Sequence, residues 1–202
     1  MVCVHDVSFG TPVPLTLDSQ RRESDIAAMR HLMLLRHAKT ERAEPGERDR
    51  DRKLTKRGRT DVPVVGSYMA QHRLVPNLAI VSPAKRAEET WALLAACFAK
   101  TPQVVTDERV YNASPERLIG IIGESGKARS LLVVGHNPSL HELAVQLIAS
   151  GDVEARERLA ENLPTSGLVV IDVPFDDWAL LRPRAGRLER FVSPRLLAAA
   201  TE

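Results

Sequence analysis

The sequence predicts a single α/β domain in which a mostly parallel, mixed sheet carries helices on both faces. Short apolar runs and stretches of helical spacing alternate along the chain, which is the pattern of such a sheet. A chain of 202 residues with 44% hydrophobic content can bury a sizeable core and is near the size of one domain. We expect this domain to cover residues 31–202. Residues 1–30 mix Pro, Ser and charged residues without a sustained period, and we interpret them as a flexible extension.

The elements follow from the spacing of apolar residues. Runs of strand length are residues 32–36, 77–82, 103–106, 130–135 and 168–173, and helical spacing covers residues 55–71, 87–98 and 140–148. Pro63 marks either the first turn of its helix or a kink, because proline removes a backbone hydrogen bond. The last two runs, residues 178–181 and 187–192, predict a terminal hairpin.

Three of the predicted strands lead into side chains that suit phosphate chemistry. Arg36 and His37 end the first strand, Arg86 falls in the first turn of the helix after the second, and His136 follows residues 130–135. Open α/β sheets hold ligands at the carboxyl ends of their strands, so we expect these side chains to share one site. An arginine offers a planar fork of donors to phosphate oxygens, and a histidine can act as a nucleophile or a general base. Taken singly each is more often a surface group, but together they favour a site for phosphoryl transfer.

The residues around these positions resemble the motifs of the histidine phosphatase superfamily, also called the phosphoglycerate mutase-like fold. Its Arg-His-Gly motif corresponds to residues 36–38, its Ser-Pro-x-x-Arg-Ala-x-x-Thr motif to residues 82–90, and its Gly-His motif to residues 135–136. The chain looks most like the short SixA-type phosphohistidine phosphatases, in which Ala often takes the third position of the first motif, as Ala38 does here. Further matches to that branch are residues 52–58, 111–115, 135–140 and 164–167, and the resemblance runs from about residue 31 to residue 192.

The resemblance implies a three-layer sandwich and a mechanism without a metal or another cofactor. His37 would attack the phosphoryl group and form a phosphohistidine intermediate, which water then hydrolyses. Arg36, Arg86 and a protonated His136 would hold the phosphoryl oxygens, where charge accumulates in the transition state.

The leaving group separates the possible substrates. An alkoxide needs a proton from an acid, and the nearest candidates here, Asp107 and Glu108, form no clear acid motif. An imidazole leaves more readily, so the sequence favours a phosphohistidine in a protein, or a small phosphorylated molecule that is similarly activated. A small-molecule phosphomonoesterase and a phosphoglycerate mutase-like enzyme remain alternatives. A non-catalytic phosphate-binding module is the third, although such a module would not need a nucleophile at His37.

Residues 41–59 form a charged loop directly after the Arg-His motif. Such a run is usually a solvated face, and the functional alternative is a lid beside the phosphate pocket. Arg52 matches an arginine of the family's Arg-Pro-Leu segment, with Lys53 in place of the proline.

Composition argues against several other classes of protein. A net charge of +2 does not call for a nucleic acid, and no apolar stretch approaches the roughly 20 residues that span a bilayer. With only Cys3 and Cys97 there is no disulfide framework, which fits a reducing cytoplasm. His136 and His141 are five residues apart and cannot share a helix face as zinc ligands. The remaining histidines, His5, His31 and His72, have no partner pattern and are expected at the surface.

Overall fold

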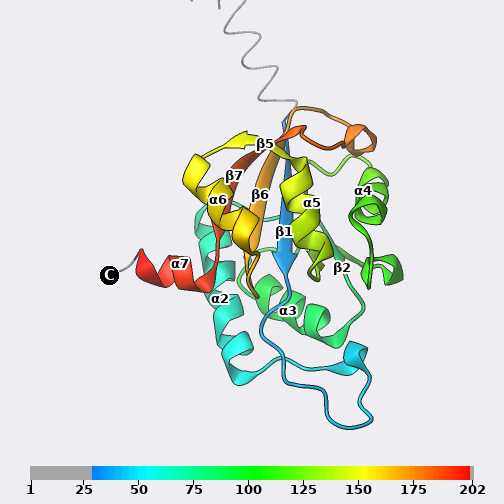
Figure 1. The fold of residues 1–202 in the computed structure, drawn as a ribbon, viewed down its shortest axis with the longest axis vertical. Coiled ribbons are helices and arrows are strands. Elements are labelled where there is room, and N and C mark those ends of the chain that lie inside the picture. The colour runs from blue at the N-terminus through cyan, green and yellow to red at the C-terminus, as the bar shows by residue number, and fades with distance from the viewer. Residues whose placement is uncertain (1–28, 201–202) are drawn as a thin grey trace, which may run out of the picture.

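The computed structural model describes residues 29–200, so the extension expected over residues 1–30 lies almost entirely outside the described residues. Its seven-stranded sheet has the order β3-β2-β4-β1-β6-β7-β5 (Figure 1). The strands are β1 (Arg30–Arg36), β2 (Leu78–Val81), β3 (Gln103–Thr106), β4 (Ser130–Gly135), β5 (Ile148–Gly151), β6 (Leu168–Val173) and β7 (Gly186–Val192). β3, β2, β4 and β1 run parallel, whereas β6 is antiparallel to both β1 and β7. The mostly parallel, mixed sheet is thus confirmed.

Helices cover both faces of the sheet, which gives the molecule three layers. The helices α4 (Pro115–Gly123), α5 (Ser139–Leu147) and α6 (Val153–Glu161) pack on one face; α2 (Lys56–Gln71), α3 (Lys85–Ala95) and α7 (Pro194–Ala199) pack on the other (Figure 1). The central strand β1 supplies both cores, because successive side chains of a strand point to opposite faces. Leu32 and Leu34 join the first core, and Met33 and Leu35 join the second.

The predicted terminal hairpin is wrong. Residues 178–181 do not form a strand, because Trp178–Leu180 is a 3-10 helix, η3. The Trp178 side chain is fully buried and its Nε1 donates to the carbonyl of Ala128 at 2.7 Å. Burying this large ring beneath α4 outweighs the strand-like pattern of the segment. β7 therefore pairs antiparallel with β6 and parallel with β5 rather than with residues 178–181.

Other differences lie at the ends of elements. Ile148, placed on a helix face by its spacing, begins β5 instead, and the sequence reading missed β5, α6 and α7. Pro63 lies in the interior of α2, well past its first turn, so the first-turn alternative is wrong. Within residues 29–200, no helix is both long and apolar enough to cross a membrane.

The parallel strands bring the three motifs to one edge of the sheet. Arg36 at the end of β1 pairs in register with Gly135 at the end of β4, and Val81 at the end of β2 pairs with Val134. The backbone of His37 continues this ladder by donating to the carbonyl of Gly135 at 3.0 Å. In Figure 1 the arrow of β1 ends beside the long blue loop that leads to α2. The strand ends and this loop together build the site.

Candidate active site

His37 lies at the carboxyl end of β1 with a defined ring orientation. Its side chain is buried, and Nδ1 lies 2.8 Å from the carbonyl oxygen of Ala38. A carbonyl only accepts hydrogen bonds, so Nδ1 carries the proton and Nε2 keeps its lone pair. Burial, together with the positive charges of Arg86 and Arg36, lowers the pKa of His37 to about 4. At neutral pH the ring is uncharged and Nε2 can act as a nucleophile.

Thr90 connects the first two motifs. Its hydroxyl accepts a hydrogen bond from the backbone N–H of Ala38 at 3.0 Å and donates to the carbonyl of Arg86 at 2.6 Å. The hydroxyl is fully buried, and it uses its donor and an acceptor for these two contacts. The threonine at the end of the second motif therefore fixes the start of α3 against the loop that carries His37.

Arg36 presents a partly unsatisfied guanidinium to the site. Its Nη1 donates to the carbonyl of Leu163 at 2.8 Å, whereas its buried Nε has no hydrogen-bond partner among residues 29–200. A buried donor without a partner is costly, and an oxyanion beside it would remove that cost. Burial lowers the pKa of Arg36, although a guanidinium remains charged in proteins.

Arg86 and His136 are in direct contact. Arg86 Nε donates to His136 Nδ1 at 3.2 Å, and His136 Nε2 lies 2.7 Å from the hydroxyl of the fully buried Ser82. Because an arginine N–H only donates, Nδ1 of His136 is the acceptor and is unprotonated. Burial, with the nearby His37 and Arg86, lowers the pKa of His136 to about 3. His136 is thus neutral in this arrangement, unlike the protonated form that the resemblance implies.

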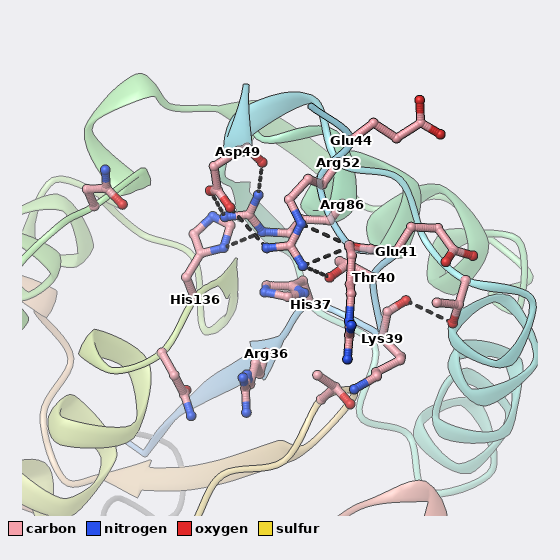
Figure 2. Close-up of a pocket in the computed structure, with 15 residues that line it drawn as sticks. Arg36, His37, Lys39, Thr40, Glu41, Glu44, Asp49, Arg52, Arg86 and His136 are labelled. Carbon is pink, nitrogen blue, oxygen red and sulfur yellow. Dashed lines mark hydrogen bonds and ion pairs between the residues drawn. The ribbon is translucent and has the colours of Figure 1, made fainter. Parts of the chain in front are cut away.

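The charged loop closes over Arg86. Arg86 Nη1 donates to the carbonyl of Asp49 at 2.6 Å and Nη2 to its carboxylate at 2.9 Å (Figure 2). Asp49 lies in the short 3-10 helix η1 (Asp49–Asp51) and also accepts from Arg52 and from the Tyr111 hydroxyl, both at 3.0 Å. Burial opposes ionisation of Asp49, but the hydrogen bonds from Arg52 and Tyr111 and the charge of Arg86 lower its pKa to about 2. The charged loop, residues 41–59, therefore borders the site in the position expected of a lid, and we refer to it as the lid.

These groups line one open cavity of about 1000 Å³. All four predicted site residues, Arg36, His37, Arg86 and His136, lie in its wall. The rings of His37 and His136 are tilted to one another, with centroids 5.1 Å apart. The other residues that line the cavity are Lys39, Thr40, Glu41, Arg42, Glu44, Asp49, Arg52, Thr55, Asn112, Asn137 and Thr165 (Figure 2). Such a wall offers several donors to a phosphoryl group and a neutral imidazole to attack it.

Comparison with known proteins agrees with this geometry. Residues 32–114 match the histidine phosphatase superfamily (branch 1). An uncharacterized protein of Mycobacterium tuberculosis is 34% identical over 164 residues, which are 80% of this chain and 100% of the relative. The crystal structure of a candidate phosphohistidine phosphatase SixA from Agrobacterium tumefaciens is 30% identical, with a TM-score of 0.71 over 82% of this chain and 98% of that one. The chain belongs to the histidine phosphatase superfamily.

A second solved structure supports the same fold. A candidate SixA from Nakamurella multipartitia has a TM-score of 0.72 over 82% of this chain and 96% of that one, at 23% identity. The phosphoglycerate mutase-like sandwich expected from the motifs is therefore the fold of this chain.

The two carboxylates considered as possible acids, Asp107 and Glu108, lie outside the cavity wall. Glu108, in the 3-10 helix η2 (Glu108–Val110), accepts from Arg50 Nη2 at 2.6 Å, which ties η2 to the lid. Asp107 caps η2, and its hydrogen bond with the Arg109 side chain lowers its pKa. Neither residue lines the cavity that holds His37.

Sequence reasoning missed several contributors. Ser82 and Thr90 belong to the quoted motif, and their hydroxyls could have been recognised as the groups that position His136 and Ala38. Asp49 gave no comparable signal, because it is one of many charged residues in the loop. His31 is exposed, as expected, and no sequence pattern indicated that its Nδ1 lies 2.7 Å from the carboxylate of Asp172. That hydrogen bond raises the pKa of His31.

Proposed function

We propose that this protein is a phosphatase that transfers a phosphoryl group to Nε2 of His37 and then to water. The observation that carries the proposal is the hydrogen bond between His37 Nδ1 and the carbonyl of Ala38. It leaves the Nε2 lone pair available, while burial and the charges of Arg86 and Arg36 keep the ring neutral by lowering its pKa. A surface histidine in a binding module would need neither the fixed tautomer nor the lowered pKa.

The reaction has two displacements at phosphorus. In the first, the Nε2 lone pair forms the N–P bond while the bond from phosphorus to the leaving group breaks and its electron pair departs with that group. In the second, a water oxygen forms a P–O bond while the N–P bond breaks and its electron pair returns to Nε2. Inorganic phosphate, which keeps the remaining water protons, is released and His37 is neutral again. Arg36 and Arg86 stabilise the negative charge on the phosphoryl oxygens in both transition states.

His136 joins this charge stabilisation only after it gains a proton. Its Nδ1 now accepts from Arg86 Nε, and a protonated Nδ1 could not accept that bond. A phosphoryl dianion raises the pKa of an adjacent imidazole by favouring its charged form. When substrate binds, we therefore expect His136 to gain a proton. The Arg86 side chain would then donate to the phosphoryl oxygens instead of to His136.

The proposed substrate is a phosphoramidate of the phosphohistidine type, in a protein or a small molecule. An imidazole leaving group does not depend on a strong general acid, and two carboxylates near the site, Asp49 and Glu108, are poor ones. Asp49 has a pKa of about 2 and is held by two arginines, and Glu108 is paired with Arg50 outside the cavity wall. An alkyl phosphate would need an acid that these carboxylates do not supply.

Covalent labelling tests the proposal. The protein is mixed with a phosphohistidine peptide, quenched without acid and digested for mass spectrometry. We expect an acid-labile phosphate on His37, no label and no turnover in His37→Asn, and normal labelling in His72→Asn, whose exposed ring packs on Tyr68 away from the site. Activity should persist in a metal chelator. A label on His136, or turnover by His37→Asn, would exclude the proposed role of His37.

A further inference from the structure

Beside the phosphoryl site the cavity holds two cationic side chains that the proposed reaction does not use. Lys39 and Arg42 both line the cavity, and neither makes a side-chain hydrogen bond or ion pair with another residue of the described range 29–200. The other arginines in the wall are engaged: Arg52 and Arg86 pair with Asp49, and Arg36 donates to Leu163. Lys39 and Arg42 therefore bring positive charge to the cavity without a protein counterion.

The backbone of Lys39 is held firmly while its side chain is free. The carbonyl of Lys39 accepts from the backbone N–H of Thr55 at 2.9 Å and from its hydroxyl at 3.3 Å. Gly58 packs so closely that an added Cβ would lie 2.3 Å from the Lys39 oxygen. The start of α2 thus fixes the backbone of Lys39, so only its side chain has to be ordered when it binds an anion.

The next residues of the segment are fixed as well. Thr40 and Leu54 form an isolated β-bridge, and Arg52 donates to the Thr40 hydroxyl at 2.7 Å and to the carbonyl of Glu41 at 2.9 Å. Arg42 follows directly after this braced segment. The segment 39–42 therefore presents both cations from an ordered backbone.

The carboxylates of the same wall do not neutralise this pair. Figure 2 shows the Lys39 side chain directed into the pocket on the side of Arg36 and His37, whereas Glu41 and Glu44 extend away from His37. The third carboxylate, Asp49, is occupied by Arg86 and Arg52. The volume of about 1000 Å³ is also at the upper end for sites that enclose drug-sized ligands, so it exceeds the needs of one phosphoryl group.

We propose that Lys39 and Arg42 form a subsite for a second anionic group, a carboxylate or another phosphoryl group, on the leaving-group side of the substrate. The inference rests on the proposed function, because it takes Arg36, His37 and Arg86 to hold the transferred phosphoryl group. It narrows the substrate class to phosphorylated compounds or peptides with a second negative charge close to the scissile bond. A substrate with a neutral leaving group would leave both cations unpaired.

Binding of three non-hydrolysable probes tests the subsite. Calorimetry in metal-free buffer compares methylphosphonate, which has one anionic group, with phosphonoacetate, which adds a carboxylate, and methylenediphosphonate, which adds a second phosphonate. We expect the wild type to bind at least one of the two probes with a second anionic group about 3- to 10-fold tighter than methylphosphonate, within the range for two exposed ion pairs. The preferred probe identifies the second group as carboxylate or phosphoryl.

Variants assign the preference to the two side chains. Lys39→Met and Arg42→Met should lose most of it while they bind methylphosphonate as the wild type does. Lys56→Met, at an exposed lysine outside the cavity wall, should keep it. Equal affinity of the wild type for all three probes, or equal weakening of all three in the variants, would overturn the subsite. If methylphosphonate itself does not bind, the proposed function fails and the subsite fails with it.

Discussion

Asp49 binds the guanidinium of Arg86 through two different oxygens. Nη1 of Arg86 lies 2.6 Å from the backbone carbonyl and Nη2 lies 2.9 Å from the carboxylate. With Nε on His136, all three nitrogens of Arg86 have a protein partner. A phosphoryl group that uses this guanidinium must share it with the lid or displace Asp49. The lid carboxylate is therefore a competitor for the substrate.

Replacing Asp49 by Asn should tighten the binding of inorganic phosphate. The amide keeps the size of the side chain but removes the charge that repels a phosphate, and we expect about a 3- to 10-fold lower Kd because the carboxylate is half exposed. Calorimetric titration measures this. Asp51→Asn is the matched control, since Asp51 pairs with Arg48 outside the cavity wall. Weaker phosphate binding by Asp49→Asn would mean that Asp49 orients Arg86 rather than competes for it.

Arg86→Lys should slow turnover by about 10²-fold or more, by analogy with the loss of a transition-state donor. Lysine keeps the charge, but its single nitrogen cannot reach a phosphoryl group with the fork geometry of the guanidinium. Steady-state kinetics on a phosphohistidine peptide test this. The control is Arg57→Lys, on the exposed surface of α2. Near-normal turnover of Arg86→Lys would remove Arg86 from the catalytic set.

The sequence predicted the site residues that follow recognisable strands, but not those whose position depends on contacts between distant parts of the chain. Arg36, His37, Arg86 and His136 could be placed together because each directly follows a recognisable strand, and parallel strands end at one edge of a sheet. Asp49 could not be placed, because it meets Arg86 across 37 positions of chain through a loop that has no periodicity. The neutral state of His136 was also beyond the sequence. It follows from burial and from the orientation of Arg86, and neither is encoded in a motif.

The same limit applies to the fold. The buried strands of the parallel half could be predicted from continuous apolar runs. Residues 178–181 resemble such a run, but residues 178–180 form a 3-10 helix that buries the Trp178 ring in the apolar core beneath α4. Tertiary packing determines the structure of this segment, and the local sequence pattern does not indicate that packing.

Glu108→Gln should have little effect on the hydrolysis of a phosphohistidine peptide. The carboxylate is paired with Arg50, and an imidazole leaving group does not depend on it. Alkyl phosphates should be poor substrates of the wild type already. The opposite pattern would be efficient hydrolysis of alkyl phosphates that Glu108→Gln slows by roughly 10²- to 10⁴-fold, with aryl phosphates unaffected. That result would replace the phosphoramidate assignment with a phosphomonoesterase and leave the role of His37 unchanged.

The two buried histidines should make the protein less stable as the pH falls from 6.5 to 4.5. The pKa values of His37 and His136, about 4 and about 3, lie below the value of 6.5 for an unperturbed imidazole. In this window the unfolded chain binds protons that the native state does not, so the free energy of unfolding decreases with decreasing pH. The raised pKa of His31 changes the free energy of unfolding only above pH 6.5, and the lowered pKa of Asp49 changes it only below about pH 4. Neither residue therefore contributes to the slope between pH 6.5 and 4.5.

Urea denaturation at several pH values measures this decrease. Each of the two histidines contributes about 1.4 kcal/mol per pH unit once the pH is well below 6.5. His37→Gln and His136→Gln should each flatten the slope, because glutamine does not titrate. NMR titration gives an independent reading: if either active-site imidazole protonates near pH 6.5 in the native protein, its environment is more polar than the contacts with Arg86, Ala38 and Ser82 imply.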